Sequence, residues 1–431
     1  MNALAVAAAL LFAAAGAAQD LAYEGAPIHY ERETTDDPVA RLVAKLAASE
    51  LELEYDARHG WLPSVLDALS IPATTQTLVF SKTSFQNRLI SPNNPRALYF
   101  GDDVYVGYVP GGDVIELSSV DPEQGPIFYA LEQARGDRPN IRRDDAGCLQ
   151  CHASPTTRGW PGHLIRSVHP DPDGFPILSS GSFTTTPSSP IAERWGGWYV
   201  TGDVGRNAHL GNRVVTATEG DRRVAPGVAE ASLDTQLAPG RHLRSDSDVV
   251  ALLVLEHQTH AHNAIARGRY ETLRALDYQK TLNRSLGDPP GTLSDSTRRR
   301  LDRAATDVVD ALLLTGEAPL DGPIRGASPF AAEYAARGPH DAEGRSLFEL
   351  DLERRLYRHA LSPMVYADAL ERLPTPLLTR VFEQLLARLG ADESSEPALA
   401  ILTATHPTFG RWRASREAAA PAEEPAEPKD G

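Results

Sequence analysis

The chain reads TLVFSKTSFQNRLISPNNPRALYFGDDVYVGYVPGGDVIEL over residues 77–117, and this stretch decides the fold class. It contains four short runs of β-branched, aromatic and leucine side chains, each as long as an ordinary strand. Clusters of Pro, Gly, Asn and Asp separate the runs, as expected for tight turns. We therefore predict an antiparallel meander with strands at 78–80, 97–100, 104–109 and 114–117 and turns at 91–95, 101–103 and 110–113.

The pattern around the meander is mixed and becomes helical in the second half of the chain. We expect helices at 38–55 and 127–134 and further short strands at 164–168, 177–179 and 198–201. From about Asp248 onward, apolar residues recur at helical spacing. Helices are predicted there at 249–276, 294–315, 345–356, 374–389 and 397–404. The fold class is therefore α+β, with a β-rich region over 19–205 and a mainly α-helical region over 206–413.

The two cysteines of the chain stand close together, in Cys148-Leu149-Gln150-Cys151-His152. This C-x-x-C-H pattern is that of covalent c-type haem attachment. Two thiols one helical turn apart reach the two vinyl groups of one porphyrin, and the imidazole that follows reaches the iron as its proximal ligand. The motif predicts one covalent haem c on Cys148 and Cys151, with His152 as iron ligand. Both thiols are then consumed, so no disulfide is expected.

Three other sites use closely spaced cysteines. A thioredoxin-like C-x-x-C follows a buried strand of a βαβ unit, whereas the residues before this motif, 142–147, are mostly polar. A zinc site needs a second pair of ligands, and the chain has only two cysteines. A structural disulfide would not need the adjacent histidine. Haem attachment is therefore the favoured interpretation.

The amino-terminal residues indicate export. An apolar run covers 3–15, and Gly16-Ala17-Ala18 supplies the small residues that precede signal-peptidase cleavage. The run is too short to span a bilayer, and no later stretch is apolar for long enough. We expect a signal peptide at 1–18, a periplasmic mature protein with no stable membrane span, and a disordered acidic and proline-rich tail at 414–431.

The composition is that of a globular protein with an acidic balance. The 431 residues include 42 Lys and Arg against 58 Asp and Glu, which gives a formal net charge of −16. Nucleic-acid binding needs a basic surface to neutralise phosphates, so no nucleic-acid partner is expected. An acidic surface suits a basic redox partner, because opposite charges steer the encounter of two proteins.

The segment Gly147-Cys148-Leu149-Gln150-Cys151-His152 resembles the haem motif of bacterial periplasmic c-type cytochromes. The segments 80–84, 95–100 and 195–202 are similar to large, secreted, single-haem bacterial proteins. The resemblance implies haem c but no particular reaction. The chain departs from a small class I cytochrome c, whose motif lies near the start and whose methionine ligand follows soon after. Here Met364, far beyond the motif, is the only methionine besides Met1. We therefore expect the compact class I fold only in a form that has been rebuilt with large insertions.

The second axial ligand of the iron separates electron transfer from catalysis. His257 is the first candidate, because it falls on the apolar stripe of the helix predicted at 249–276. Met364 is the second, because it follows a proline in an irregular segment, as many ligand methionines do. An open site is the third possibility. His163, His169, His209 and His260 are further candidates, and each of these side chains has a purely structural role as its alternative.

Three functions are compatible with a covalent haem. The first is a periplasmic c-type cytochrome that exchanges electrons with a partner protein. The second is a haem enzyme of peroxidase or oxygenase type, with an open distal site and a small-molecule substrate, since a bare electron carrier does not need 431 residues. The third is a haem-based sensor or a subunit of a redox complex. The sequence leaves open whether the protein is an enzyme.

Overall fold

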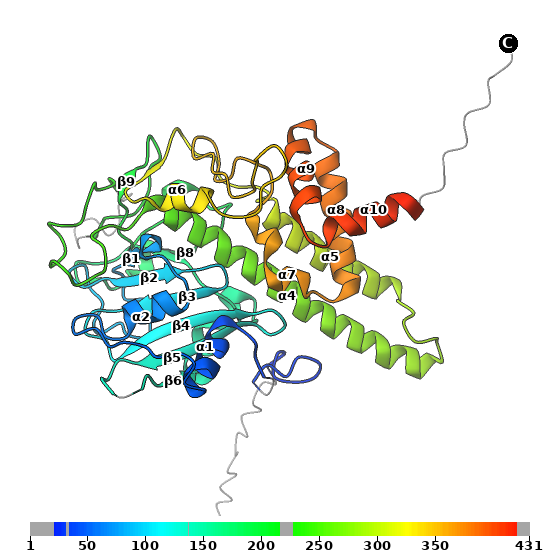
Figure 1. Cartoon of the computed structure of the whole chain (residues 1–431), viewed down its shortest axis with the longest axis horizontal. Helices are drawn as coiled ribbons and strands as arrows, with labels where there is room; N and C mark the ends of the chain where they lie inside the picture. Colours follow the sequence, from blue (N-terminus) through cyan, green and yellow to red (C-terminus); the bar gives the residue numbers. More distant parts are fainter. Residues whose placement is uncertain (1–20, 32–33, 137, 216–226, 420–431) are drawn as a thin grey trace, which may run out of the picture.

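A computed structural model describes residues 21–31, 34–136, 138–215 and 227–419. Its centre is a six-stranded sheet in which each strand pairs antiparallel with the next one along the chain (Figure 1). The predicted meander and the α+β class are confirmed. The strands are β1 (Thr77–Val79), β2 (Arg96–Phe100), β3 (Val104–Tyr108), β4 (Val114–Asp121), β5 (Gly125–Glu132) and β6 (Ile141–Arg143).

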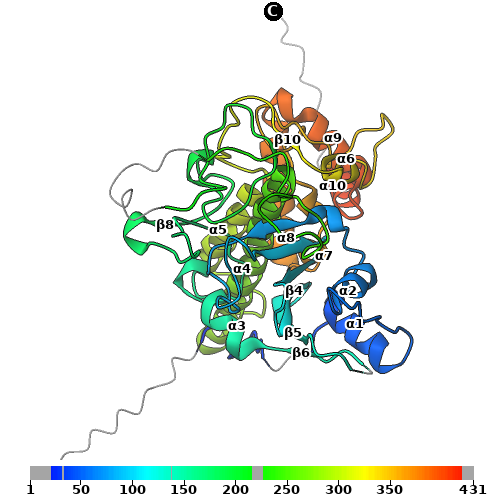
Figure 2. The ribbon, with the colours of Figure 1, turned by 90° about the vertical axis from the view of Figure 1, so that its left-hand side faces the viewer.

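Helices cover both faces of the sheet and fill the second half of the chain. Figure 2 shows α1 and α2 on one side of the sheet and α4 on the other. The helices are α1 (Pro38–Ala47), α2 (Leu62–Ala68), α3 (Asp145–His152), α4 (Val249–Leu286), α5 (Asp295–Leu312), α6 (Phe330–Ala335), α7 (Asp368–Glu371), α8 (Thr375–Gly390), α9 (Glu396–Thr405) and α10 (Phe409–Ala419). Two small ribbons pair β7 (Arg166–Val168) with β8 (Ser182–Thr184) and β9 (Gly202–Asp203) with β10 (Arg325–Gly326).

The two faces of the sheet belong to different layers, because successive side chains of a strand point in opposite directions. Val106, Leu117 and Tyr129 lie opposite one another on β3, β4 and β5. They pack in a core that α1 and α2 share. The other face carries Tyr105 and Phe128, which flank Ser118 in the same register. This second face is the one that α4 crosses.

Helix α4 joins the sheet to the helical half of the molecule. It begins at Asp248, whose carboxylate accepts hydrogen bonds from the backbone N–H groups of Val250 and Ala251. It ends at Gly287, a glycine with a left-handed backbone (φ 75°) that suits a helix C-cap. Its first turns are buried on all sides, since they pack in one core with sheet residues and with α5 and α8. The helix predicted at 249–276 thus continues to Leu286.

The short helix predicted at 127–134 is wrong, because these residues form strand β5. Every residue of β5 except its last is buried. A strand that is buried on both faces shows no alternation of apolar and polar side chains. Its short apolar run therefore cannot be told from a buried helix by periodicity.

The helix predicted at 345–356 is also wrong, because this segment consists of turns and a single isolated bridge. The carboxylate of Asp341 accepts hydrogen bonds from the backbone N–H groups of Glu343 and Arg345. Leu352 has a positive φ of 59°. Side-chain hydrogen bonds to nearby backbone compete with helix formation, and they prevail here over the apolar spacing.

Several predicted boundaries also shift. The helix predicted at 38–55 ends at Ala47, residues 178–180 form a 3₁₀ turn, and residues 198–201 make only isolated bridges. The tail predicted at 414–431 starts too early, because residues 414–419 belong to α10, which runs to Ala419. Residues 420–431 and the predicted signal peptide at 1–18 lie outside the described residues.

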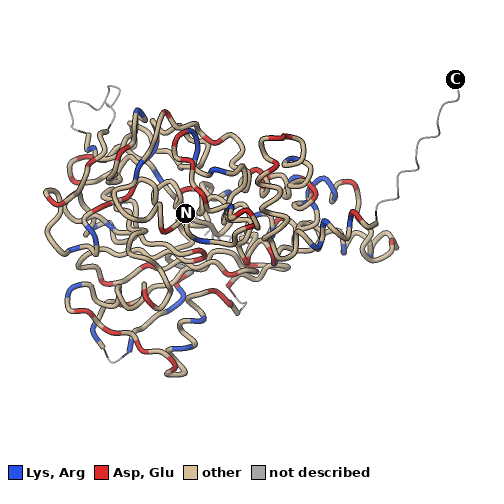
Figure 3. Tube along the Cα trace, turned by 45° about the horizontal axis from the view of Figure 1, so that its top comes forward, with Lys and Arg blue, Asp and Glu red and all other residues tan. Residues whose placement is uncertain are grey.

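Charged residues are spread over both halves of the molecule, with Asp and Glu interspersed among Arg and Lys (Figure 3). Within the described part of the chain, no helix combines the length and the apolar character that a membrane crossing requires.

A buried ion pair fixes the segment before β9 to α4. Nη1 of Arg194 lies 2.9 Å from Oε2 of Glu256, and the two side chains are 4% and 1% exposed. Arg194 also donates hydrogen bonds to the carbonyl oxygens of Ser189 and Pro187. Burial raises the pKa of Glu256 to about 7, and the charge of Arg194 opposes this rise. The pair therefore links the loop at 187–194 to the central helix.

We expect Arg194→Met to lower the free energy of unfolding by about 3–5 kcal/mol, because it leaves Glu256 buried without a cation. The stranded carboxyl group will bind a proton more readily in the folded state, so the loss should be smaller at acidic than at alkaline pH. Urea unfolding at both pH values measures the change. The control is Arg206→Met, which removes an exposed ion pair with Asp321 and should cost less than about 1 kcal/mol. Equal losses for the two variants would contradict the prediction.

Candidate haem attachment site

The cysteine motif lies on α3, a short helix that directly follows the edge strand β6. Asp144 caps this helix by accepting a hydrogen bond from the backbone N–H of Gly147. Cys148 and Cys151 lie one helical turn apart and therefore on one face of the helix. No disulfide joins them, and Cys148 is half-buried while Cys151 is exposed. This is the arrangement that two thioether bonds to one porphyrin require.

The motif does follow a strand, which the polar residues at 142–147 did not suggest. That strand, β6, pairs antiparallel with β5 alone and is not buried. A thioredoxin-like motif instead follows a buried strand of a βαβ unit. The site therefore differs from a thioredoxin-like site in its topology, because an antiparallel edge strand that is not buried precedes the motif.

The imidazole of His152 is fixed in one tautomer. Its Nδ1 lies 2.8 Å from the carbonyl oxygen of Gly162. Because a carbonyl only accepts, we assign the proton to Nδ1, which leaves a lone pair on Nε2. Among the described residues Nε2 has no hydrogen-bond partner. Burial lowers the pKa of His152, so the ring is neutral at pH 7 and able to bind a metal.

Helix α4 holds the loop that carries Gly162. The N–H of Gly162 returns to the carbonyl oxygen of His152 at 2.9 Å. Asn263 of α4 clamps the next residue, because its Oδ1 accepts from the N–H of His163 (2.7 Å) and its Nδ2 donates to the carbonyl oxygen of His163 (2.8 Å). A Cβ at position 162 would lie 2.9 Å from Oδ1 of Asn263, so this close approach requires a glycine.

Arg96 lies near the imidazole of His152, and one of the N–H groups of Arg96 has no hydrogen-bond partner among the described residues. Its guanidinium is paired with Glu116, and both side chains are mostly buried. The Nε of Arg96 is buried and has no hydrogen-bond partner in the described structure. The charges of Arg96 and Glu116 act on the pKa of His152 in opposite directions. Gly107 makes room for Arg96, since a Cβ there would meet the guanidinium.

Aromatic rings continue from His152 across the sheet. The ring of Phe128 lies 4.6 Å from that of His152 and 6.3 Å from that of His163, between ring centres. The ring of His163 in turn lies 4.5 Å from that of Tyr105. Nε2 of His163 is 2.8 Å from the hydroxyl of Ser118, while its Nδ1 is buried without a partner in the described residues. Burial lowers the pKa of His163 well below its usual value.

Tyr105, His262 and Asp103 form a hydrogen-bonded triad at the end of these rings. Nε2 of His262 lies 3.2 Å from Oδ1 of Asp103, and Nδ1 of His262 lies 2.8 Å from the hydroxyl of Tyr105. When Nε2–H is donated to the carboxylate, the neutral ring of His262 accepts the hydrogen bond from Tyr105 at Nδ1. Burial raises the pKa of Tyr105 well above its usual value, so the phenol keeps its proton.

The structure places His257 and Met364 together, in the helical half. Nε2 of His257 lies 2.5 Å from the hydroxyl of Ser362, and its ring packs against Tyr357. The N–H of Met364 donates to the same hydroxyl. Burial lowers the pKa of His257 to about 3. In the described part of the chain no hydrogen bond or ring contact joins either residue to α3.

Of the remaining histidines, His163 alone among the described candidates shares a ring contact with His152, through Phe128. His169 contacts Phe183, His209 accepts from the N–H of Gly211, and burial lowers the pKa of His260 to about 4. Sequence reasoning did not find Arg96 or the triad. The one sequence signal for His262 is that it stands close to His257 and His260 in the helix predicted at 249–276.

Comparisons with known proteins gave no match to a family model, to a curated protein or to a solved structure.

Gly107→Ala tests the packing of Arg96. The new Cβ would displace the guanidinium and break its pair with Glu116, and we expect a loss of about 1–3 kcal/mol in the free energy of unfolding. In an Arg96→Ala background the same substitution should cost much less, because the obstacle is gone. Urea unfolding of the four proteins gives the coupling. Gly25→Ala, where a Cβ meets nothing within 4 Å, is the control. Additive losses at positions 96 and 107 would show that the two do not compete for space.

Proposed function

We propose that the protein carries one haem c, bound through Cys148 and Cys151, with Nε2 of His152 as proximal iron ligand. The observation that carries the proposal is the hydrogen bond from Nδ1 of His152 to Gly162. It presents Nε2 as a lone-pair donor directly after two cysteines one helical turn apart. Hydrogen bonding of the second ring nitrogen to a backbone carbonyl is the usual way in which proteins orient a metal-binding histidine.

The surroundings of α3 also suit a haem. The two propionates of a haem need donors, and the buried Nε of Arg96 is a donor without a partner in the described residues. The ring of Phe128 supports the imidazole of His152 from the sheet. When bound, haem c supplies an iron that takes up and releases one electron. Residues of this chain would attach it, orient the proximal imidazole and compensate the propionate charge.

Two loops near this site expose apolar side chains. Ser84 and Gln86 of the first loop donate hydrogen bonds to Glu116. Lys82 ties the second loop to the first, because its N–H donates to Gly174 and its ammonium lies 4.9 Å from the ring centre of Phe175. Exposed large apolar side chains of the two loops are Phe85, Leu89, Phe175 and Leu178. Such side chains are suited to cover the edge of a porphyrin or to meet a partner protein.

We infer a periplasmic electron-transfer role as the first function, with the predicted signal peptide at 1–18 as the basis for export. A haem enzyme with an open distal site is the second candidate. The observation that favours it is the position of His257 and Met364, whose hydrogen bonds are made to Ser362 and not near α3. With neither residue as a ligand, the sixth position of the iron is left for His163 or for an exogenous molecule.

Covalent attachment is tested by expression in cells with an active cytochrome c maturation system. The wild-type band should stain for haem on a denaturing gel, because thioether bonds survive denaturation. Cys148→Ala and Cys151→Ala should lose most of the stain. Gln150→Ala leaves the two cysteines and the histidine in place and should stain like the wild type. An unstained wild-type band would overturn the proposal.

The visible spectrum tests the sixth ligand. We expect His257→Ala and Met364→Ala to keep the wild-type spectrum and spin state, since neither side chain contacts the haem motif. His163→Ala is the comparison, because the rings of His163 and His152 both contact Phe128. Thermal unfolding of each variant checks that it is folded. A change from low spin to high spin in the first two variants alone would show that one of them binds the iron.

A further inference from the structure

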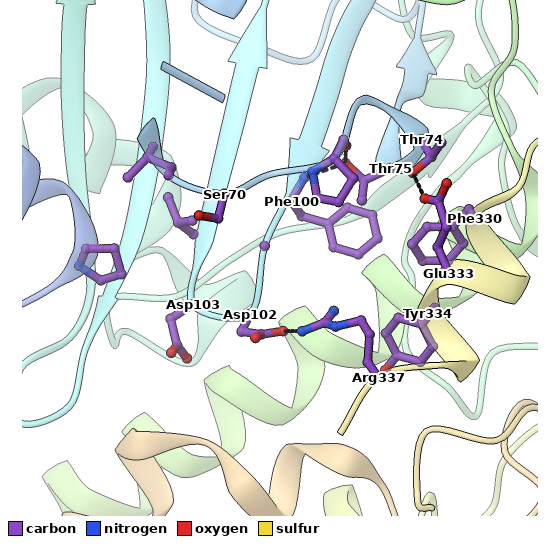
Figure 4. Close-up of a pocket in the computed structure, with 15 residues that line it drawn as sticks. Ser70, Thr74, Thr75, Phe100, Asp102, Asp103, Phe330, Glu333, Tyr334 and Arg337 are labelled. Carbon is purple, nitrogen blue, oxygen red and sulfur yellow. Dashed lines mark hydrogen bonds and ion pairs between the residues drawn. The ribbon is translucent and has the colours of Figure 1, made fainter. Parts of the chain in front are cut away.

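A cavity opens beside the turn between β2 and β3 (Figure 4). Its volume of about 620 Å³ is in the range of small-molecule sites. It is lined by the start of α1, the end of α2, the segment 72–75, the β2–β3 turn and α6. Its apolar lining includes Phe100 and Phe330, whose rings are in contact at 5.7 Å.

The charged residues that line the cavity are mainly acidic. They are three carboxylates, from Asp102, Asp103 and Glu333, and one guanidinium, from Arg337. Arg337 pairs with Asp102, as Figure 4 shows. Glu333 accepts a hydrogen bond of 2.6 Å from the hydroxyl of Thr74. Two negative charges therefore have no cation among the lining residues.

Asp103 is held in place from the interior. Its side chain bonds only to Nε2 of His262 among the described residues. Its carbonyl oxygen accepts from the N–H of Val120 at 2.7 Å. Gln258 of α4 donates to the carbonyl oxygens of Gly101 and Asp102 at 2.6 and 2.8 Å. The turn is thus fixed by these hydrogen bonds, and the side chain of Asp103, which is 24% exposed, lines the cavity.

We propose that this cavity binds a small organic cation, with its ammonium group on Asp103 and an aromatic or branched apolar body against the rings that line the wall. A fixed carboxylate pairs with an ammonium without a large ordering cost. Aromatic rings bind both apolar groups and cations. An anionic ligand is disfavoured by the charge balance of the lining. The proposal does not depend on the haem, because none of these residues belongs to α3.

The test is isothermal titration calorimetry of the purified full-length protein with benzylammonium and 2-phenylethylammonium. Benzyl alcohol and benzoate are the neutral and anionic probes. We expect at least one ammonium probe to bind at least tenfold more tightly than both of these. Asp103→Asn keeps an acceptor for His262 but removes the charge, and it should weaken binding of that probe at least tenfold.

Two further variants test whether the carboxylates of the cavity are responsible for binding. Glu333→Gln removes the other carboxylate that has no cation among the lining residues. It lies outside the triad and should weaken binding severalfold, even if Asp103→Asn fails to fold. Asp203→Asn, at an exposed carboxylate on β9, should leave binding unchanged. Absence of ammonium binding, equal binding of the neutral probe, or equal binding by the wild type and both cavity variants would overturn the proposal.

Discussion

Two hydrogen bonds between Gly162 and His152 determine what the cysteine motif is able to do. The carbonyl oxygen of Gly162 accepts a hydrogen bond from Nδ1–H of His152, and the N–H of Gly162 donates to the carbonyl oxygen of His152. The loop after α3 is thereby closed on the imidazole. The hydrogen bond from Nδ1–H fixes the tautomer of the ring and, together with the packing of Phe128, the direction in which Nε2 is presented. If the protein carries the proposed haem, the fold orients its proximal imidazole before the haem binds.

Helix α4 is what makes that closure possible. Asn263 holds the peptide groups of His163 from 100 positions away in sequence. The same helix pairs with Arg194 through Glu256 and clamps the β2–β3 turn through Gln258. The haem motif, the buried ion pair and the acidic cavity are therefore all positioned by one rigid element. A change in α4 would be expected to alter both proposed sites.

Much of the architecture could be predicted from periodicity, because the meander and the long helices have clear patterns. Strand β5 was missed since both of its faces are buried, and the segment at 345–356 was missed since Asp341 and Leu352 favour turns. The C-x-x-C-H motif is local and can be read directly from the sequence, and the haem that it predicts stays a prediction. Arg96, Tyr105 and Asp103 come to the sites only through strand pairing and contacts with α4, which no local pattern encodes.

The distal ligand stays a prediction, and the position of His257 shows the same limit. The apolar stripe of α4 correctly indicated that His257 is buried. An apolar stripe predicts that a side chain is buried, but it does not predict in which core of the protein the side chain lies. His257 packs with Ser362 and Tyr357 in the helical half, whereas α3 borders the core on the sheet. Only the tertiary fold separates the two.

The most direct test of the central claim is the pyridine haemochrome spectrum of the protein matured in vivo. This spectrum counts haems per chain, and its α-band position reports how many vinyl groups have been converted to thioethers. The account predicts one haem per chain with both vinyl groups saturated. A chain without haem, or one whose haem extracts with both vinyl groups intact, would contradict it.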